Sequence, residues 1–322
     1  MTSVTLDPIT MTNAPTIQMP ATAARKRAAL ASARTLLTHI LHGVKRRVQA
    51  SVVDPTAPSI TAALTHPAAI KKLAAVAHHD AQREKISAVY LAAIKRCLMS
   101  AQAEALHKIN GTSPVKLMNS AAVADFPFNL ANFSKMFFAE MRSAGAEALQ
   151  QSGSAMNEEL GLAPGEFDTG HGIAKKFLIE RENKLKDVPQ EVYDRVKATL
   201  EQGTNAGETE RQLAQRVADE MGAYENGNAQ TIARTETASA YGTGRMDSLT
   251  QAGFTFKSWL TADDGKVRDS HEACEAQGAI PVGEPFGNGL DYPGDPEGAA
   301  DEVINCRCVL QAAEDPEGGD NA

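Results

Sequence analysis

One uninterrupted helical pattern of about forty residues constrains this chain more than any other feature. It begins at Thr65-His66-Pro67, where a proline fits the first turn of a helix, and runs to Asn110-Gly111, where glycine favours an end. Apolar residues recur along it at the spacing of one helix face: Ile70, Leu73, Val76, Ala77, Ile86, Val89, Ala93, Ile94, Cys97, Ala101 and Ile109. Unbroken, such a helix would span roughly 60 Å, which suits a bundle or stalk better than a compact catalytic core.

Two adjacent histidines, His78 and His79, fall inside this helix. Neighbouring residues on a helix point in different directions, so the two rings make a poor metal-binding pair. We expect both at the surface.

Composition favours further helices. Alanine is abundant, and it has the best intrinsic helix propensity, while aromatic residues make up 5% of the chain with a single Trp. Hydrophobic residues make up 43% of the 322 residues, so a substantial core can form. Helical patterns are predicted over residues 130–151, 173–186, 190–202, 208–221 and 228–251.

The pattern changes near the C-terminus. Residues 254–262 alternate and carry aromatic side chains, which predicts a strand. Residues 277–301 are rich in Gly, Pro and Asp, which predicts a loop, and residues 304–312 predict a short closing strand. The fold class is therefore α+β: a mainly helical N-terminal region followed by a compact helical domain with a small C-terminal sheet.

Gly-rich residues 152–172 are the best candidate for a boundary between domains. We expect a disordered arm at 1–20, a helical docking region at 21–155, a compact domain at 156–312 and an acidic tail at 313–322.

Charge is unevenly distributed along the chain, although the net charge is −8. Residues 21–50 contain no acid and seven bases, whereas residues 251–322 contain four bases and fifteen acids. The basic segment 21–50 suggests an anionic partner such as DNA. The alternative is that its charges only form the solvated face of a helix. The candidate DNA-binding residues are Arg25, Lys26, Arg27, Lys45, Arg46 and Arg47.

Targeting features are not expected. The first residues do not have the charged start and apolar run of a signal peptide, and no stretch of about 18 apolar residues predicts a membrane span. Four cysteines are too sparse for a disulfide framework. We expect a protein made in a reducing cytoplasm.

An ordered set of motifs occupies the last third of the chain. It starts with Arg234, Thr235 and Glu236 in the sequence A-R-T-E. Four residues on and after the aromatic strand follow: Trp259, Asp264, Arg268 and His271. It ends in the sequence N-C-R-C at Asn305, Cys306, Arg307 and Cys308. In this order, over about residues 190–312, the set resembles the phage head-morphogenesis family that includes the F protein of phage Mu.

The resemblance implies a minor head protein that acts by binding and not as an enzyme. Members of that family associate with the portal and enter the procapsid, where they assist assembly or the fate of packaged DNA. The implied partners are the portal protein, capsid or scaffold proteins and, non-specifically, DNA, but no membrane. The implied location is the virion head at the portal vertex, after assembly in the host cytoplasm.

The charged motif residues have a structural and a catalytic interpretation. Arg234 and Glu236 lie two apart on a helix and therefore do not pair with each other. We expect Arg234 to reach a carboxylate elsewhere, with Asp263 and Asp264 as candidates. An active-site Arg/Glu pair, as in some transferases, is the alternative, but no Gly-rich nucleotide loop accompanies it.

Four residues offer the donor set of a zinc ion. His271 and Cys274 are three apart, which places them on one face of a turn, and Cys306 and Cys308 would share one side of a strand. Together they supply one nitrogen and three sulfurs to a structural Zn²⁺. Equally open from spacing alone is a core in which the thiols only pack and His271 only hydrogen-bonds.

Catalytic alternatives use the same loop. A metal nuclease would need carboxylates such as Asp264 and Asp269 to converge with His271 on an ion. A Cys/His nucleophilic pair is a second possibility. Both stand as rivals to the binding function, as a phage-encoded nuclease or toxin-like enzyme domain.

Overall fold

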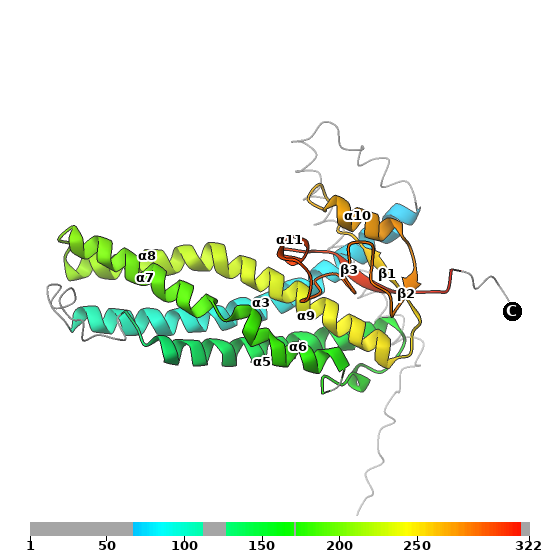
Figure 1. Cartoon of the computed structure of the whole chain (residues 1–322), viewed down its shortest axis with the longest axis horizontal. Coiled ribbons are helices and arrows are strands. Elements are labelled where there is room, and N and C mark those ends of the chain that lie inside the picture. The colour runs from blue at the N-terminus through cyan, green and yellow to red at the C-terminus, as the bar shows by residue number, and fades with distance from the viewer. Residues whose placement is uncertain (1–66, 112–126, 171, 317–322) are drawn as a thin grey trace, which may run out of the picture. The chain divides into compact units, whose positions relative to one another are not determined.

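The structure is a computed structural model that describes residues 67–111, 127–170 and 172–316 (Figure 1). The chain divides into two compact units, Met1–Ala77 and His78–Ala322. The expected arm, the basic helix with its six candidate DNA-binding residues, and most of the acidic tail lie outside the described residues. In the part of the chain that the structure describes, no helix has the length and apolar character to cross a membrane.

The long first helix is confirmed as α3, Pro67–Asn110, with proline at its first position. Its buried side chains within the second unit include Ile86 and Tyr90, and His79 and Arg83 continue the same face at helical spacing. The expectation that both histidines are surface residues is wrong for His79, which is 3% exposed. Its Nδ1 lies 2.9 Å from the hydroxyl of Tyr241, which satisfies the buried ring.

The next helix, α5, runs over Leu130–Glu159 and begins at Asn129, whose side chain accepts the backbone N–H of Asn132. The expected end at residue 151 is wrong, and so is a linker starting at 152. Gly153 does not stop the helix: a Cβ there would lie 2.3 Å from the ring of Phe167. Glycine therefore allows close packing at this position.

Four further helices confirm the sequence prediction. They are α6 (Gly172–Leu185), α7 (Val188–Asn205), α8 (Glu210–Tyr224) and α9 (Gln230–Gln251). A capping box between Thr209 and Gln212 starts α8. A π-helical segment, η2 (Glu225–Ala229), joins α8 directly to α9, and a 3-10 turn, η1 (Pro164–Glu166), follows α5.

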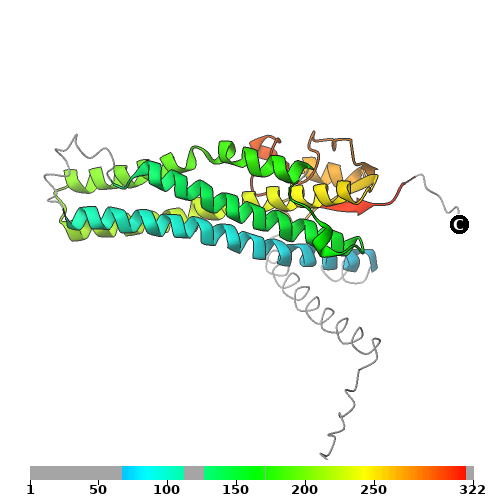
Figure 2. The same ribbon diagram turned by 90° about the horizontal axis from the view of Figure 1, so that it is seen from below.

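Helix α9 is the centre of the second unit. Every residue from Glu236 to Leu249 is buried, so this part of the helix is covered on all sides. It packs along α5, and both views show the two helices side by side (Figures 1 and 2). Gly244 permits that approach, because a Cβ there would lie 1.9 Å from the Ser152 hydroxyl.

The C-terminal part forms a three-stranded antiparallel sheet in the order β2-β1-β3. Its strands are β1 (Phe256–Leu260), β2 (Ile280–Pro281) and β3 (Val309–Ala313), and Leu260 pairs with Val309. Two short helices, α10 (Asp269–Ala276) and α11 (Ala300–Val303), flank an irregular loop. The closing strand starts at Val309 and not at 304, so the two cysteines precede it. The α+β, mostly helical fold class is confirmed.

Candidate functional site

The four residues Asn305–Cys308, here called the N-C-R-C segment, connect α11 to β3. Its side chains contact several parts of the second unit. Motif residues that are far apart in sequence, such as Arg234 and Asn305, therefore meet around one short stretch of backbone.

Asn305 anchors the segment to α9. Its φ of 57° lies in the left-handed region, which asparagine tolerates better than most side chains. Arg234 Nε donates to Asn305 Oδ1 at 2.9 Å, and the backbone N–H of Asn305 donates to the Thr235 hydroxyl at 3.3 Å. Two residues of the A-R-T-E motif thus hold the turn before the cysteines.

Arg307 anchors the segment to the turn after β1. Its guanidinium makes a bidentate ion pair with Asp264, and Arg268 donates to the carbonyl of Ile304 at 2.7 Å. Burial lowers the pKa of Arg307, but the ion pair with Asp264 outweighs it and the net shift is upward. Asp264, one of the two carboxylates expected to bind Arg234, thus pairs with Arg307 instead. Arg234 instead hydrogen-bonds to the Asn305 amide and the Thr231 hydroxyl, since its place on α9 faces the turn at 305.

Glu236 forms a separate ion pair with Arg181 of α6, and its side chain is 2% exposed. Hydrogen bonds from Arg181 Nε and Nη2 reach its two carboxylate oxygens. The pair joins α6 to α9 in the core, away from Arg234, as a structural ion pair would.

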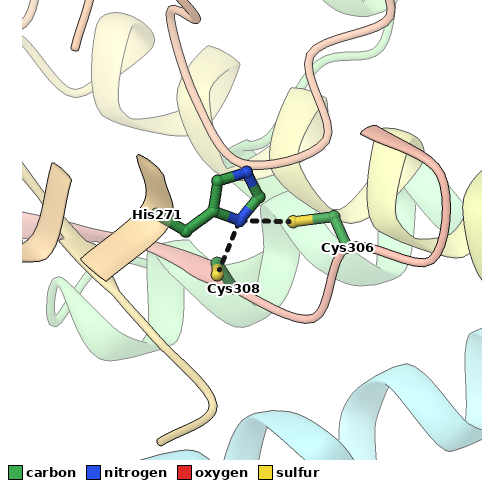
Figure 3. A group of neighbouring side chains, drawn as sticks. All are labelled: His271, Cys306 and Cys308. Atoms are coloured by element: carbon green, nitrogen blue, oxygen red, sulfur yellow. Dashed lines mark hydrogen bonds between the residues drawn. The ribbon is translucent and has the colours of Figure 1, made fainter. Parts of the chain in front are cut away.

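His271, Cys306 and Cys308, here called the thiol–imidazole cluster, lie together between α10 and the N-C-R-C segment. His271 Nδ1 is 3.3 Å from Cys308 Sγ and 3.9 Å from Cys306 Sγ, and Figure 3 shows the nitrogen facing both sulfurs. All three ligand atoms lie within 4.8 Å of one another.

Glu302 of α11 fixes the other side of the imidazole. Its carboxylate lies 2.8 Å from His271 Nε2 and also accepts hydrogen bonds from the Ser270 hydroxyl and the Asn288 amide. Burial acts to raise the pKa of Glu302, but these hydrogen bonds hold it below its ordinary value. An ionised Glu302 favours the tautomer with the proton on Nε2, which leaves the Nδ1 lone pair facing the sulfurs.

The two thiols have opposite electrostatic tendencies. A hydrogen bond from Cys308 stabilises the Cys306 thiolate and lowers its pKa well below the ordinary value, while sharing that proton raises the pKa of Cys308. The arrangement supports one thiolate next to one thiol, as expected for two interacting groups.

The cluster is closed to solvent. His271 and Cys306 are 1% exposed and Cys308 is 6% exposed. The Trp259 ring lies edge-on to His271 with 5.0 Å between centroids. The buried indole Nε1 has no hydrogen-bond partner in the described structure.

Cys274, the fourth expected ligand, does not join this cluster. It is buried on α10 and interacts with the backbone amides of Asn288 and Gly287, while burial raises its pKa. The structure therefore brings the ligand atoms of three of the four predicted ligands together. Cys274 packs in the same apolar core as the other two cysteines, but its sulfur is not part of that group.

Two residues of the site were missed in the sequence. Arg83 of α3 is buried and donates to the backbone carbonyls of Cys306 and Arg307. A charged residue on an otherwise buried helix face was a usable signal for it. Glu302 carried no such signal, because it stands among many acids in the loop region.

The second cluster of potential ligands in the described residues is His78, His79 and Glu159. Its parts already have protein partners, since Glu159 pairs with Arg245 and His79 with Tyr241. Neither cluster contains two carboxylates, so among the described residues the acids near His271 do not form the group that a metal nuclease would use.

A protein-family model matches part of the chain. Residues 194–311 match the family model described as Phage Mu protein F like protein, and this range contains every motif residue from Arg234 to Cys308. No curated protein and no solved structure matches the chain.

Proposed function

We propose that the chain is a minor head protein which associates with the portal vertex, because residues 194–311 match the family model described as Phage Mu protein F like protein. The match supports a protein of phage head morphogenesis. We further propose that it helps procapsid assembly and acts in DNA packaging or ejection.

The family match is the observation that carries the proposal. It covers α8, α9, the sheet and the N-C-R-C segment, which are the elements that the motif residues hold together. In this chain the motif residues mostly contact one another or the backbone. Their chemistry therefore supports a stable fold that presents its outer surfaces to partners.

Binding is favoured over catalysis by the burial of the reactive groups. The His271 ring and the Cys306 thiol are 1% exposed, so a macromolecular substrate has no direct access to them. Trp259 and Glu302 occupy two further sides of the imidazole. This geometry supports a structural role for the cluster against the nuclease or toxin-like alternative.

The helices supply extended surfaces for docking. Charged side chains lie at the surface of α3 and α5, including Arg96 and Arg142, which pair with Glu140 and Glu182 on the neighbouring helices. Exposed Met99 adds an apolar group on α3. We propose that residues 21–155 contain the portal-contacting surface.

Coexpression with the portal, scaffold and major capsid proteins of the same phage tests the proposal. The full-length chain should copurify with procapsids when the portal is present and be lost from them when the portal gene is omitted. Retention in mature DNA-filled heads is expected. Equal incorporation without the portal contradicts portal docking, and complete loss on maturation identifies a scaffold instead.

The basic residues between 21 and 50 support a further proposed contact with DNA phosphates. Such binding should be independent of sequence and fall steeply with salt, because it releases counterions. Charge reversal at Arg25, Lys26, Arg27, Lys45, Arg46 and Arg47 should abolish it in a filter-binding assay. Unchanged affinity would show that this segment is a solvated or protein-binding face.

A further inference from the structure

The thiol–imidazole cluster has the geometry of a metal site. We propose that His271 Nδ1, Cys306 Sγ and Cys308 Sγ bind a zinc ion, and that the ion secures the backbone to which Arg83 of α3 is attached. The proposal is independent of the role in head assembly.

Distances between the three atoms fit a tetrahedral ion. Zinc bonds of about 2.3 Å to sulfur and about 2.0 Å to nitrogen give tetrahedral nitrogen–sulfur edges of about 3.5 Å. The two nitrogen–sulfur distances of 3.3 and 3.9 Å lie on either side of that value. Small shifts of both thiols would bring both distances to that value.

The support around His271 is that of a metal ligand. A carboxylate bound to one ring nitrogen orients the ring and leaves the other nitrogen free to coordinate, and Glu302 has this relation to His271 at 2.8 Å. Glu302 is itself held by Ser270 and Asn288, so the ring is fixed before an ion arrives.

The surroundings of the sulfurs suit anionic thiolates. The guanidinium of Arg83 is hydrogen-bonded to the carbonyl of Cys306 at 2.6 Å and places a positive charge beside the cluster. The buried indole N–H of Trp259 interacts with Cys308, although it has no partner at ordinary hydrogen-bond geometry. A thiolate is a better acceptor for this N–H than a thiol, so metal binding at Cys308 would strengthen this contact.

The protein ligand set is one nitrogen and two sulfurs. Cys274 interacts with the amides of Asn288 and Gly287 and lies outside the cluster. Soft thiolate ligands together with an imidazole select zinc over magnesium or calcium. A non-protein ligand completes the tetrahedron in this assignment.

The ion would act on α3 through backbone geometry. Arg83 donates to the carbonyls of both Cys306 and Arg307, which belong to the stretch that the two cysteine ligands bracket. Fixing both thiols fixes these carbonyls, and Arg83 then ties α3 to the C-terminal sheet region. Metal binding therefore contributes to folding and to the attachment of one helix.

Metal content of the full-length protein, purified under reducing conditions without chelator, tests the ligand set. We expect about one zinc per chain and, after cobalt substitution, the near-ultraviolet thiolate-to-cobalt absorption. Cys306→Ser, Cys308→Ser and His271→Ala should each lose the ion. Cys274→Ser and Cys97→Ser are matched controls, since both cysteines are buried and lie outside the cluster, and they should keep it.

Two results would overturn the ligand assignment. One is a parent protein that is purified without metal and whose melting temperature does not rise when zinc is added. This outcome contradicts the assignment also where the cause is a disulfide between Cys306 and Cys308. The other is loss of zinc from Cys274→Ser to the same degree as from Cys306→Ser.

Hydrogen exchange tests the coupling to α3. Chelation should speed exchange of α3 amides around Arg83 in the parent protein. The Arg83→Gln variant should still bind zinc, but its α3 exchange should no longer depend on the metal. Exchange in the parent that is unchanged by chelation would refute the coupling.

Discussion

The α7–α8 hairpin and the C-terminal sheet region, residues 254–313, are stabilised in different ways. The hairpin buries an apolar stripe, with Val196 and Leu200 on α7 and Leu213 and Val217 on α8, and its charged residues remain largely at the surface. The sheet region has three short strands and a long irregular loop. Buried polar side chains hold that loop to the rest of the unit.

Lys257 shows this clearly. It is fully buried on β1, and its ammonium donates to the carbonyls of Val282 and Asp291 on the loop. Regular helices satisfy their own backbone, whereas irregular backbone needs side-chain partners when it is buried. Removing a single polar side chain should therefore lower the unfolding free energy more in the sheet region than in the hairpin. In the hairpin, the loss of buried apolar volume should have the larger effect.

The largest effect is expected at Arg245, which links α9 to β3. It is fully buried, pairs with Glu159 and donates from Nε to the carbonyl of Leu310 at 2.6 Å. Arg245→Ala removes all of these contacts and should cost about 3–5 kcal/mol of unfolding free energy in denaturant titrations. The hairpin control Lys197→Ala, at an exposed ion pair with Glu201, should leave the midpoint nearly unchanged.

Shortening a buried apolar side chain should destabilise the hairpin, in contrast to removing one of its exposed charges. Leu213 is fully buried in the hairpin, so Leu213→Ala leaves a cavity and should cost about 2–4 kcal/mol. Thermal and denaturant unfolding measure it. If Leu213→Ala lowered the unfolding free energy by less than Lys197→Ala does, the hairpin would not depend on its apolar stripe.

One buried polar residue, His79 on α3, should make the stability of the helical part depend on pH. Burial, followed by the charge of Arg245, lowers the pKa of His79 from 6.5 to about 2. Below pH 6.5 the unfolded chain binds a proton that the folded protein does not, so stability is full above this pH and falls as pH decreases. The loss should be about 2 kcal/mol between pH 7 and 5. His79→Leu should lack this part of the slope, and identical slopes would contradict the buried neutral ring.

The smallest effect is expected at the pair of Arg307 and Asp264. Both side chains are about one-third exposed, so solvent screens the pair. Asp264→Asn should cost about 1 kcal/mol despite the bidentate geometry. A cost as large as that of Arg245→Ala would mean that the N-C-R-C segment depends mainly on this ion pair.

Helical periodicity predicted most of the fold. Apolar residues at helical spacing, proline starts and glycine stops located α3, α6, α7, α8 and α9 within a few residues. The prediction failed at Gly153, because a glycine that ends a helix and one that admits Phe167 look alike in sequence. It failed at His79 because the Tyr241 hydroxyl that satisfies the ring is 162 residues away.

The site was predictable in its residue types but not in its pairings. The ordered motifs identified Asn305, Arg307 and their neighbours, yet Asp264 pairs with Arg307 rather than with Arg234. Spacing placed His271 and Cys274 on one helix, but three-dimensional packing directs Cys274 toward the loop amides. Pairings between distant segments depend on how α10 and α11 are placed, which local sequence does not encode.

Asymmetric cryo-EM reconstruction of procapsids, assembled with and without this chain, tests the central claim most directly. A head-morphogenesis protein associated with the portal should add density inside the shell at the single portal vertex and nowhere else. Mass spectrometry of the same particles should detect the chain. Added density at all vertices, or particles that lack the chain while assembling normally, would contradict the account.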